Sequence, residues 1–241
     1  MGITALLLAA GFGTRLKPIT NTCPKCLVHV GNQPILGDWL DKLEAIGCDK
    51  VLVNTHYLNN QVENYLSSRE TFDMGVEVKY EPKLLGTAGT IVKNSHELLN
   101  DIIIVIHADN FTDMDLSEIV NAHKERPNNC LMTMLTFTTT EPKSCGIVKK
   151  DDNNIVKSFY EKSATPYGDC ANAAIYLFDE SLIEEFRSMN NPIDFSTDVI
   201  PHLMGRIYSY HTNSIFIDIG TKENLYKARN YFLQKSSSIN N

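Results

Sequence analysis

Short apolar runs alternate, over the first half of the chain, with stretches in which apolar residues recur every three or four positions. The strand-like runs lie at 6–8, 51–53, 76–80 and 102–106, and the helix-like stretches lie at 35–46 and 58–66. Pro34 and Gly47 bound the first of these helices. Strands that alternate with helices in this order are typical of parallel sheets with right-handed crossovers. The pattern therefore predicts an α/β fold with a doubly wound, mostly parallel sheet.

The second half of the chain is richer in alternating strands. We expect strands at 131–137, 147–148, 155–160, 171–178 and 215–219, and helices through Leu99 and over 116–120, 179–189, 195–204 and up to Leu233. The segment 235–241 is polar and is expected to be a disordered tail. We interpret 1–234 as one domain, with a first half at about 1–125 and a strand-rich half at about 126–234.

Composition removes several classes of protein. The chain has 241 residues and no run of about 18 apolar positions, so no membrane span is expected. No basic segment precedes the first apolar run, which argues against a signal peptide and favours a cytoplasmic protein. Of the six cysteines, Cys23 and Cys26 have metal-ligand spacing but lack a second pair, so reduced thiols are expected. The formal charge of −7 argues against a nucleic-acid partner.

The strand at 6–8 leads into a glycine-rich segment followed by two cations. Gly11 and Gly13 lack a Cβ, so the backbone can take positive φ and bring its N–H groups close to a triphosphate. Arg15 and Lys25 add positive charge toward the same anion. The spacing is neither that of a dinucleotide fingerprint nor that of a P-loop. It predicts a phosphate-binding turn at the end of a strand.

The longer string Leu8-Ala9-Ala10-Gly11-Phe12-Gly13-Thr14-Arg15-Leu16, with Pro24-Lys25-Cys26-Leu27, resembles the signature of the sugar-1-phosphate nucleotidylyltransferases. Within that family the nearest likeness is to the guanylyltransferases of mannose and heptose 1-phosphates. The resemblance implies a Rossmann-like, GT-A-type nucleotidyltransferase fold, with a nucleotide half at 1–125 and a small sugar-binding half at 126–234. It also implies that Leu8–Ala10, Gly11, Gly13 and Thr14 bind the nucleotide.

A second loop, at 84–89, resembles the second nucleotide loop of the family and implies that Gly86 and Thr87 bind the nucleotide. Glu81 stands where the family places a residue that reads the base. A carboxylate accepts two parallel hydrogen bonds, which matches the N1–H and N2–H donors of guanine, so GTP is favoured. A solvated strand end for Glu81, and a helix cap for Thr87, are the alternatives.

Two aspartates follow apolar strands. Asp109 comes directly after 102–106, and Asp218 lies in the run Ile217-Asp218-Ile219-Gly220-Thr221. A carboxylate at a strand end that faces a triphosphate suits Mg²⁺, and the resemblance implies that both acids are metal ligands. A turn-forming role and a helix-charge role are the respective alternatives. Asp113 and Asp115 have the Asp-x-Asp spacing of some glycosyltransferases, but they fit better as the cap and first turn of the next helix.

The strand-rich half carries four matches to the sugar-binding residues of the family: Gly146, Glu161, Lys162 and Asn172. Carboxylate and amide groups suit sugar hydroxyls, and an ammonium suits the sugar phosphate. Two positions depart from the family pattern, because Ser163 replaces a proline and Phe216 replaces a tryptophan.

The resemblance implies a transfer of a nucleotidyl group from an NTP to a sugar 1-phosphate, with release of pyrophosphate. We expect Arg15, Lys25, Asp109 and Asp218 to carry the chemistry, with Mg²⁺ as the cofactor. The alternatives are a member that uses UTP, dTTP or CTP, a glycosyltransferase that uses Asp113 and Asp115, and a nucleotide-binding subunit without catalysis. No pattern identifies the sugar, and a homodimer is one candidate assembly.

Overall fold

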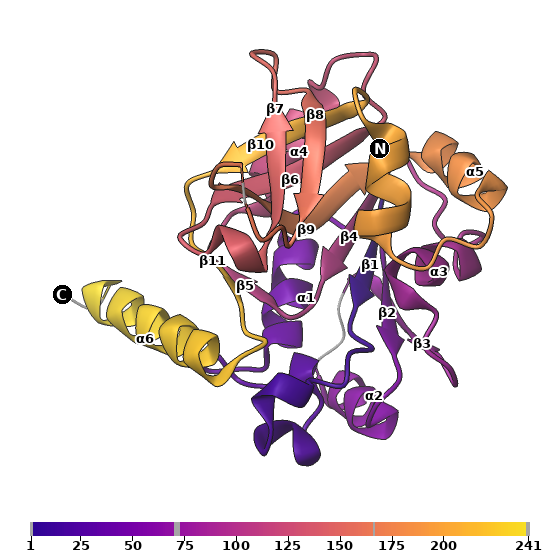
Figure 1. Cartoon of the computed structure of the whole chain (residues 1–241). Helices are drawn as coiled ribbons and strands as arrows, with labels where there is room; N and C mark the ends of the chain where they lie inside the picture. Colours follow the sequence, from indigo (N-terminus) through magenta and orange to yellow (C-terminus); the bar gives the residue numbers. More distant parts are fainter. Residues whose placement is uncertain (1, 70–72, 166, 240–241) are drawn as a thin grey trace.

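A computed structural model describes residues 2–69, 73–165 and 167–239. Its main sheet has the strand order β10-β6-β9-β4-β1-β2-β3, with β7 paired to β9 and β8 paired to β7. The strands are β1 (Ile3–Leu8), β2 (Lys50–Thr55), β3 (Gly75–Tyr80), β4 (Ile102–His107), β6 (Met132–Thr138), β7 (Gly146–Lys150), β8 (Val156–Glu161), β9 (Cys170–Phe178) and β10 (Ile207–Thr212). Figure 1 shows this sheet at the centre of the molecule.

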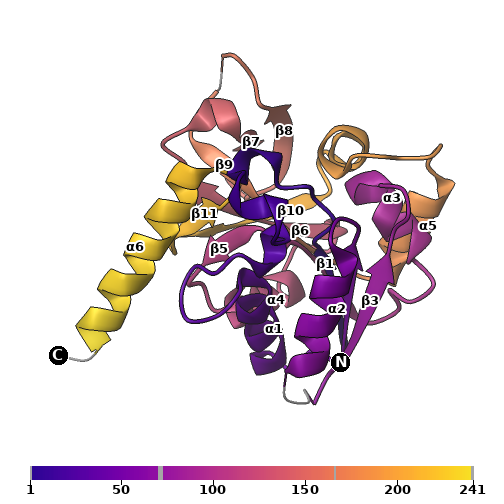
Figure 2. The same ribbon diagram turned by 90° about the horizontal axis from the view of Figure 1, so that it is seen from below.

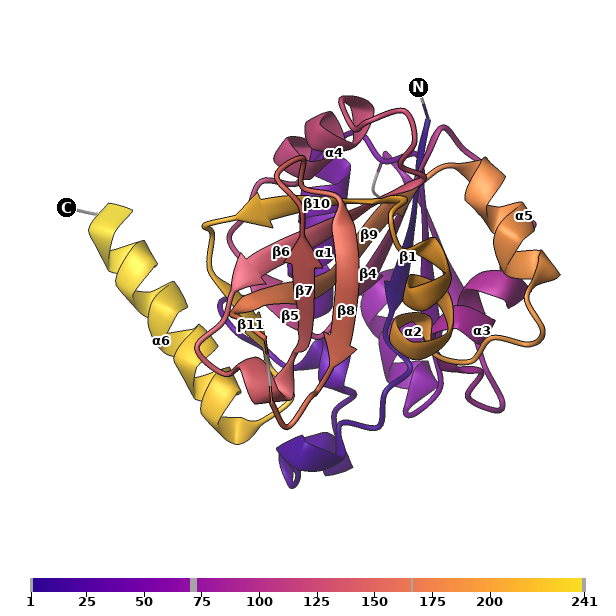
Figure 3. The same cartoon turned by 45° about the horizontal axis from the view of Figure 1, so that its top comes forward.

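Strands β1, β2, β3 and β4 pair in parallel, as the alternation of strands and helices predicts. Strand β9 enters antiparallel between β4 and β6, so a single sheet runs through both halves of the chain. The β7–β8 hairpin joins this sheet through β7, which pairs with β9 (Figure 3). The predicted doubly wound, mostly parallel α/β fold is confirmed.

Helices cover both faces of the sheet. They are α1 (Ile35–Ala45), α2 (Asn59–Ser68), α3 (Gly86–Lys93), α4 (Leu116–Lys124), α5 (Glu180–Ser188) and α6 (Lys222–Ile239). Alternate residues of β1 and β4 enter two separate apolar clusters, one shared with α1 and α4 and the other with α3 and α5. Figure 2 shows α3 and α5 together on one side of the sheet. This two-sided burial explains why the run at 102–106 is apolar throughout.

Three helices depart most from their predicted bounds. Helix α3 ends at Lys93, before the predicted Leu99, and Asn94 is its C-cap, whose Nδ2 donates to Thr90 O at 2.9 Å. The predicted 195–204 helix is split into η5 (Phe195–Val199) and η6 (Ile200–Leu203), and Pro201 lies in the first turn of η6. Helix α6 continues past Leu233 to Ile239, so the expected tail from Lys235 begins as helix.

Two short strands that sequence periodicity does not predict as a pair build the second sheet. Strand β5 (Asn110–Thr112) follows β4 directly, and β11 (Phe216–Asp218) pairs with it antiparallel. The register sets Asp218 opposite Asn110, one residue after Asp109. This small sheet therefore brings two strand-end acids together across a sequence separation of about half the chain. In the part of the chain that the structure describes, no helix is long and apolar enough to span a membrane.

Candidate active site

Lys25 connects the two strand-end acids. Its segment, η3 (Lys25–Leu27), follows Pro24, whose backbone is extended. The Lys25 side chain is buried, and its Nζ donates to Asp109 Oδ2 and, at 3.1 Å, to Asp218 Oδ1. Ile219 N donates to Asp109 O at 3.0 Å and holds the two acid-bearing segments side by side. The predicted cluster of Lys25, Asp109 and Asp218 is thus present.

Arg15 approaches the same cluster from the glycine-rich turn. Its guanidinium lies 3.6 Å from Asp218 Oδ2, while 66 % of its side chain remains exposed. A loose, exposed ion pair of this kind holds an arginine without committing its hydrogen bonds, so the guanidinium can turn to a substrate phosphate.

Burial and charge act in opposite directions on these ionisable groups. Burial opposes the ionisation of Asp109, but the adjacent Lys25 ammonium outweighs it and holds the pKa of that carboxyl below its usual range. Burial lowers the pKa of His107, so its imidazole is neutral, and its Nε2 has no hydrogen-bond partner among the described residues. Asp109 therefore stays a carboxylate at neutral pH.

The two carboxylates fit the metal that the sequence predicts. Mg²⁺ is commonly held by one or two carboxylates together with substrate phosphates and water, rather than by a cage of protein ligands. Asp109 and Asp218 both touch one ammonium, so their oxygens converge on one small volume. Among the described residues no group of three or more His, Cys, Asp or Glu side chains forms a closed metal site. The donor set therefore fits an ion that shares its ligands with a nucleotide.

The acids open onto a cleft of about 610 Å³. All four predicted sugar-binding residues line it together with Arg15, Asp109 and Asp218; they are Gly146, Glu161, Lys162 and Asn172. Its walls also carry hydroxyl and amide side chains, namely Thr138, Thr139, Thr140, Ser144, Ser196, Thr221 and Asn224. Such a lining suits a polyhydroxylated ligand with an anionic group at one end.

The β7–β8 hairpin positions two of these sugar-binding residues. Gly146 is opposite Glu161 in the antiparallel register, and a Cβ on Gly146 would lie 2.4 Å from the Phe159 ring and 2.8 Å from Glu161 Oε2. The missing side chain therefore makes room for the Glu161 carboxylate. Lys162 pairs with that carboxylate at 3.2 Å and keeps an exposed ammonium.

Asn172 is fixed by its own strand. Its Oδ1 accepts from Ala174 N at 2.9 Å, and its Nδ2 donates to Tyr176 OH at 2.7 Å. The second hydrogen of the Asn172 amide remains for a ligand in the cleft.

The glycine-rich turn treats its two glycines differently. Gly13 has φ 63°, and the Thr20 hydroxyl donates to its carbonyl at 2.7 Å. Gly11 does not have positive φ, contrary to expectation, and a Cβ there would meet nothing within 4 Å. Fold alone therefore explains glycine at 13 but not at 11. Leu8–Ala10 lie at and just beyond the end of β1, and Thr14 begins the short helix η1 (Thr14–Leu16) that carries Arg15.

Glu81 is neither exposed nor free. It is 1 % exposed, its Oε1 accepts from Thr90 Oγ1 at 2.5 Å and from Asn54 Nδ2 at 3.3 Å, and its Oε2 accepts from Leu85 N at 3.2 Å. The predicted solvated strand end is therefore wrong. The predicted base reader also meets a difficulty, because donors of this chain already occupy both oxygens.

The second loop packs against a distant segment. Gly86 has φ 77°, and a Cβ there would lie 2.3 Å from Ile193 O. The Thr87 hydroxyl accepts from Phe195 N at 2.7 Å instead of capping α3. Both residues thus join the loop to the start of η5, whose Ser196 lines the cleft.

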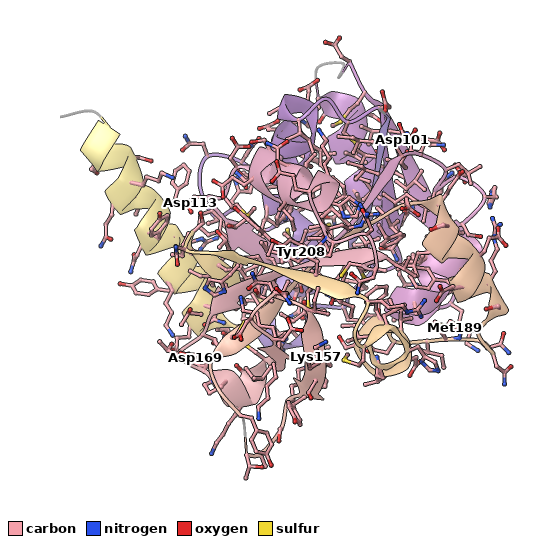
Figure 4. All side chains as sticks on the ribbon, turned by 90° about the horizontal axis from the view of Figure 1, so that it is seen from above. Asp101, Asp113, Lys157, Asp169, Met189 and Tyr208 are labelled. Atoms are coloured by element: carbon pink, nitrogen blue, oxygen red, sulfur yellow. The ribbon has the colours of Figure 1, made fainter. Side chains whose placement is uncertain are left out.

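Asp113 and Asp115 have structural roles. Asp115 is the N-cap of α4 and accepts from Ser117 N at 2.8 Å, as predicted. Asp113 does not belong to that first turn; it accepts from Tyr231 OH and, at 2.7 Å, from Lys235 Nζ of α6 (Figure 4). Neither acid lines the cleft, so the glycosyltransferase alternative loses both its residues.

Sequence reasoning missed three residues of the site. A Cβ on Gly220 would lie 2.8 Å from Arg15 Nη2 and 2.9 Å from Lys25 Nζ. Asn224 lines the cleft and donates to Asp218 O at 2.9 Å. Asn54 lies near the end of β2 between the two loops, and its position close to a strand end was the available signal.

A fold with the local order β3-β2-β1-β4 and a cleft beyond the carboxyl ends of its strands defines an α/β protein with a ligand site at the switch point. A family model described as nucleotidyl transferase matches residues 4–235. The chain belongs to the nucleotidyl transferase family, and the resemblance inferred from its motifs is confirmed.

Three curated relatives extend the comparison. The chain is 28 % identical to a UTP–glucose-1-phosphate uridylyltransferase of Synechocystis over 93 % of its own length and 62 % of that protein. It is 28 % identical to a mannose-1-phosphate guanylyltransferase of Mycobacterium tuberculosis, over 92 % of its own length and 62 % of that protein. It is 30 % identical to a mannose-1-phosphate guanylyltransferase catalytic subunit beta of Drosophila melanogaster, over 91 % of its own length and 60 % of that protein. The chain thus spans about three fifths of the length of these relatives.

Solved structures share the fold. A crystal structure of a putative glucose-1-phosphate thymidylyltransferase from Bacillus anthracis superposes with a TM-score of 0.86 at 22 % identity, over 96 % of this chain and 95 % of that one. A crystal structure of a UDP-glucose pyrophosphorylase complexed with UDP-glucose gives a TM-score of 0.83 at 19 % identity, over 98 % of this chain and 100 % of that one. At these identities the likeness supports the fold.

Proposed function

We propose that this chain transfers a nucleotidyl group from an NTP to a sugar 1-phosphate. An oxygen of the sugar phosphate attacks the α-phosphorus, the bond from that phosphorus to the β-phosphate oxygen breaks, and pyrophosphate leaves. The observation that carries the proposal is the meeting, in one cleft, of a cationic turn, two strand-end carboxylates and a sugar-type lining. The main barrier is the approach of one anion to another, so charge neutralisation and alignment dominate.

Each residue of the cluster has a role in this proposal. The backbone of Gly11–Thr14 binds the triphosphate, and the exposed Arg15 guanidinium stabilises the departing pyrophosphate. Lys25 turns from the carboxylates to the incoming phosphate, which Lys162 also aligns. Bound between Asp109 and Asp218, Mg²⁺ would supply positive charge at the α-phosphate. No general base is required, because the attacking phosphate oxygen is already ionised.

The sugar is bound by the strand-rich half. Glu161 accepts hydrogen bonds from ring hydroxyls, Asn172 donates one, and the backbone at Gly146 lies against the ring. The room that Gly146 gives to the Glu161 carboxylate and the fixed rotamer of Asn172 support this assignment.

We further propose GTP as the nucleotide, with a mannose or heptose 1-phosphate as the acceptor class. The names of two relatives, both mannose-1-phosphate guanylyltransferases, support this choice. The uridylyltransferase among the relatives supports UTP as the second candidate. Glu81 lends no support to guanine, because its oxygens accept from Leu85, Thr90 and Asn54.

A pyrophosphate-release assay tests the proposal. The purified chain is incubated with Mg²⁺, each of GTP, UTP, dTTP and CTP, and a panel of sugar 1-phosphates that includes mannose, heptose and glucose. We expect release only when both substrates are present, with GTP fastest. Fastest release with UTP or dTTP contradicts the choice of GTP. Tight nucleotide binding without release for any pair contradicts catalysis and favours a binding subunit.

A further inference from the structure

Asn54 lies between the two loops that flank the nucleotide side of the site. It is the last residue but one of β2, which in the sheet order stands between β1 and β3, and it is 3 % exposed. Its Oδ1 accepts from Ala9 N, in the first loop, at 2.7 Å. Its Nδ2 donates to Glu81 Oε1 and to Thr90 Oγ1, each at 3.3 Å. One side chain therefore contacts the turn after β1, the end of β3 and the first turns of α3.

Every polar atom in this buried group has a partner. Thr90 Oγ1 donates to Glu81 Oε1 at 2.5 Å with Gly86 O also within reach at 2.9 Å, and Leu85 N donates to Glu81 Oε2 at 3.2 Å. A glutamine at position 81 would have only one oxygen. Its NH₂ would therefore face either Leu85 N or the donors Thr90 Oγ1 and Asn54 Nδ2. The carboxylate is therefore explained by the internal network, without a base.

We propose that Asn54 is a positioning residue that sets the spacing between the two nucleotide loops, and that Glu81 anchors the second loop instead of reading the base. This inference rests on the proposed function and deepens it. The Ala9 N–H is held by Asn54, and the backbone from Leu85 to Gly86 is held by Glu81 and Thr90. A nucleotide that contacts both loops binds tightly only when their separation is correct, so the network acts on NTP affinity.

An exchange of the charge between the two residues tests the pairing. Asn54→Asp places two carboxylates against each other, and Glu81→Gln turns an amide toward Leu85 N or Thr90. In the double variant, the carboxylate introduced at position 54 would accept from Ala9 N and from the new amide at position 81, whose oxygen would accept from Leu85 N. The network is then restored with its charge moved from one residue to the other. Such a cycle separates a specific pairing from two independent losses.

The readout is the Kd of each NTP, measured by titration calorimetry, together with kcat and both KM values. We expect each single variant to raise the NTP Kd and KM about tenfold or more, and the double variant to recover to within about threefold of wild type, as coupled buried partners do. The KM for the sugar 1-phosphate and kcat at saturation should change by less than about threefold. The order of preference among the four NTPs should be unchanged in Glu81→Gln.

The control is Asn100→Asp, which alters an amide that donates to Thr4 Oγ1 at 2.9 Å at the other end of β1. It should leave the NTP Kd unchanged. Thermal unfolding of every variant checks that the fold is kept.

Three outcomes overturn the inference. The first is an unchanged NTP Kd in the single variants, and the second is a double variant that loses as much NTP affinity as the two single variants together. The third is a changed base preference in Glu81→Gln. These outcomes differ from failure of the proposed function, which is the absence of pyrophosphate release by wild type. If wild type binds NTP without turnover, the Kd cycle still tests the pairing. If wild type binds none of the four NTPs, the inference fails together with the function.

Discussion

At the scale of single residues, the site is a balance of charges around Lys25. One buried ammonium contacts two carboxylates, and the exposed Arg15 guanidinium adds a second positive charge at the edge. Under the proposed function, an anionic substrate would draw these cations away from the acids, and Mg²⁺ would then compensate the two carboxylates. In the structure, the two carboxylates are thus compensated by cations of the chain itself.

The first prediction concerns Arg15 and Asp109. We expect Arg15→Ala and Asp109→Ala to keep the fold but to lower kcat by about a hundredfold to a thousandfold, because each removes a charge that acts on the reacting phosphates. Steady-state pyrophosphate release and thermal unfolding measure the two properties. Lys17→Ala, an exposed cation of the same segment, is the control and should be nearly normal. Chelation of Mg²⁺ should abolish wild-type turnover, and added Mg²⁺ should restore it. Near-normal rates in either variant would refute these roles.

The second prediction concerns Gly220. The three atoms nearest to a Cβ on Gly220 would all be side-chain ends, namely Arg15 Nη2 at 2.8 Å, Asp218 Oδ1 at 2.8 Å and Lys25 Nζ at 2.9 Å. Gly220→Ala should therefore change the free energy of unfolding by less than about 1 kcal/mol, while displacement of the two cations lowers kcat about a hundredfold. Gly75→Ala is the matched control, because its Cβ would lie 3.8 Å from the nearest atom, Asp49 O. Equal activity of the two variants would show that the space at Gly220 is irrelevant to the chemistry.

At the scale of elements, the sequence predicted what depends on local periodicity and missed what depends on pairing. The parallel strands, Asp115 as the cap of α4 and the placement of Asp109 after β4 follow from local patterns. The strand at β11 was predicted, but the three-residue strand β5 was not, and it is their pairing that brings Asp218 to Asp109. The buried partners of Glu81 were equally hidden, because they come from β2 and α3. Sequence thus located the residues, and tertiary pairing decided their surroundings.

The third prediction concerns the turn after β1. Gly13→Ala should destabilise the protein by about 1 kcal/mol or more, because the residue has φ 63° and its Cβ would lie 2.8 Å from Thr20 Cγ2. Gly11→Ala should leave the unfolding free energy nearly unchanged, since nothing lies within 4 Å of its Cβ. It should nevertheless raise the KM for NTP about tenfold if the turn presses its backbone against the triphosphate. Urea unfolding and initial rates measure both effects, and a normal KM in Gly11→Ala would exclude close backbone contact there.

At the scale of the whole molecule, the two halves share one sheet and one cleft. Strand β9 joins β4 of the first half to β6 of the second, and η5 connects the loop at Thr87 to Ser196 in the cleft. Helix α6 crosses back to the first half and is held by Asp113 before it projects from the body (Figure 1). Loops from both halves are thus attached to one sheet, which suits the alignment of two substrates that the proposed function requires.

The last prediction concerns the stability of the fold toward acid. His123 of α4 is buried against β6, where its Nδ1 contacts Thr133 Oγ1 at 2.8 Å, and burial, with Arg126 nearby, lowers its pKa to about 3. The unfolded chain binds a proton at a histidine below about pH 6.5, whereas the folded chain does not until about pH 3, so stability falls as pH falls through that window. Between pH 7.5 and 5.5 the uptake of this proton by the unfolded chain is equivalent to one proton over one pH unit. It therefore lowers the free energy of unfolding by about 1.4 kcal/mol. Urea unfolding of His123→Gln should show a fall in the free energy of unfolding between pH 7.5 and 5.5 that is smaller than the wild-type fall by about that amount, whatever the stability of the variant at pH 7.5. The exposed control His96→Gln should show the same fall as wild type. An unchanged decline in His123→Gln would assign the acid sensitivity to other groups.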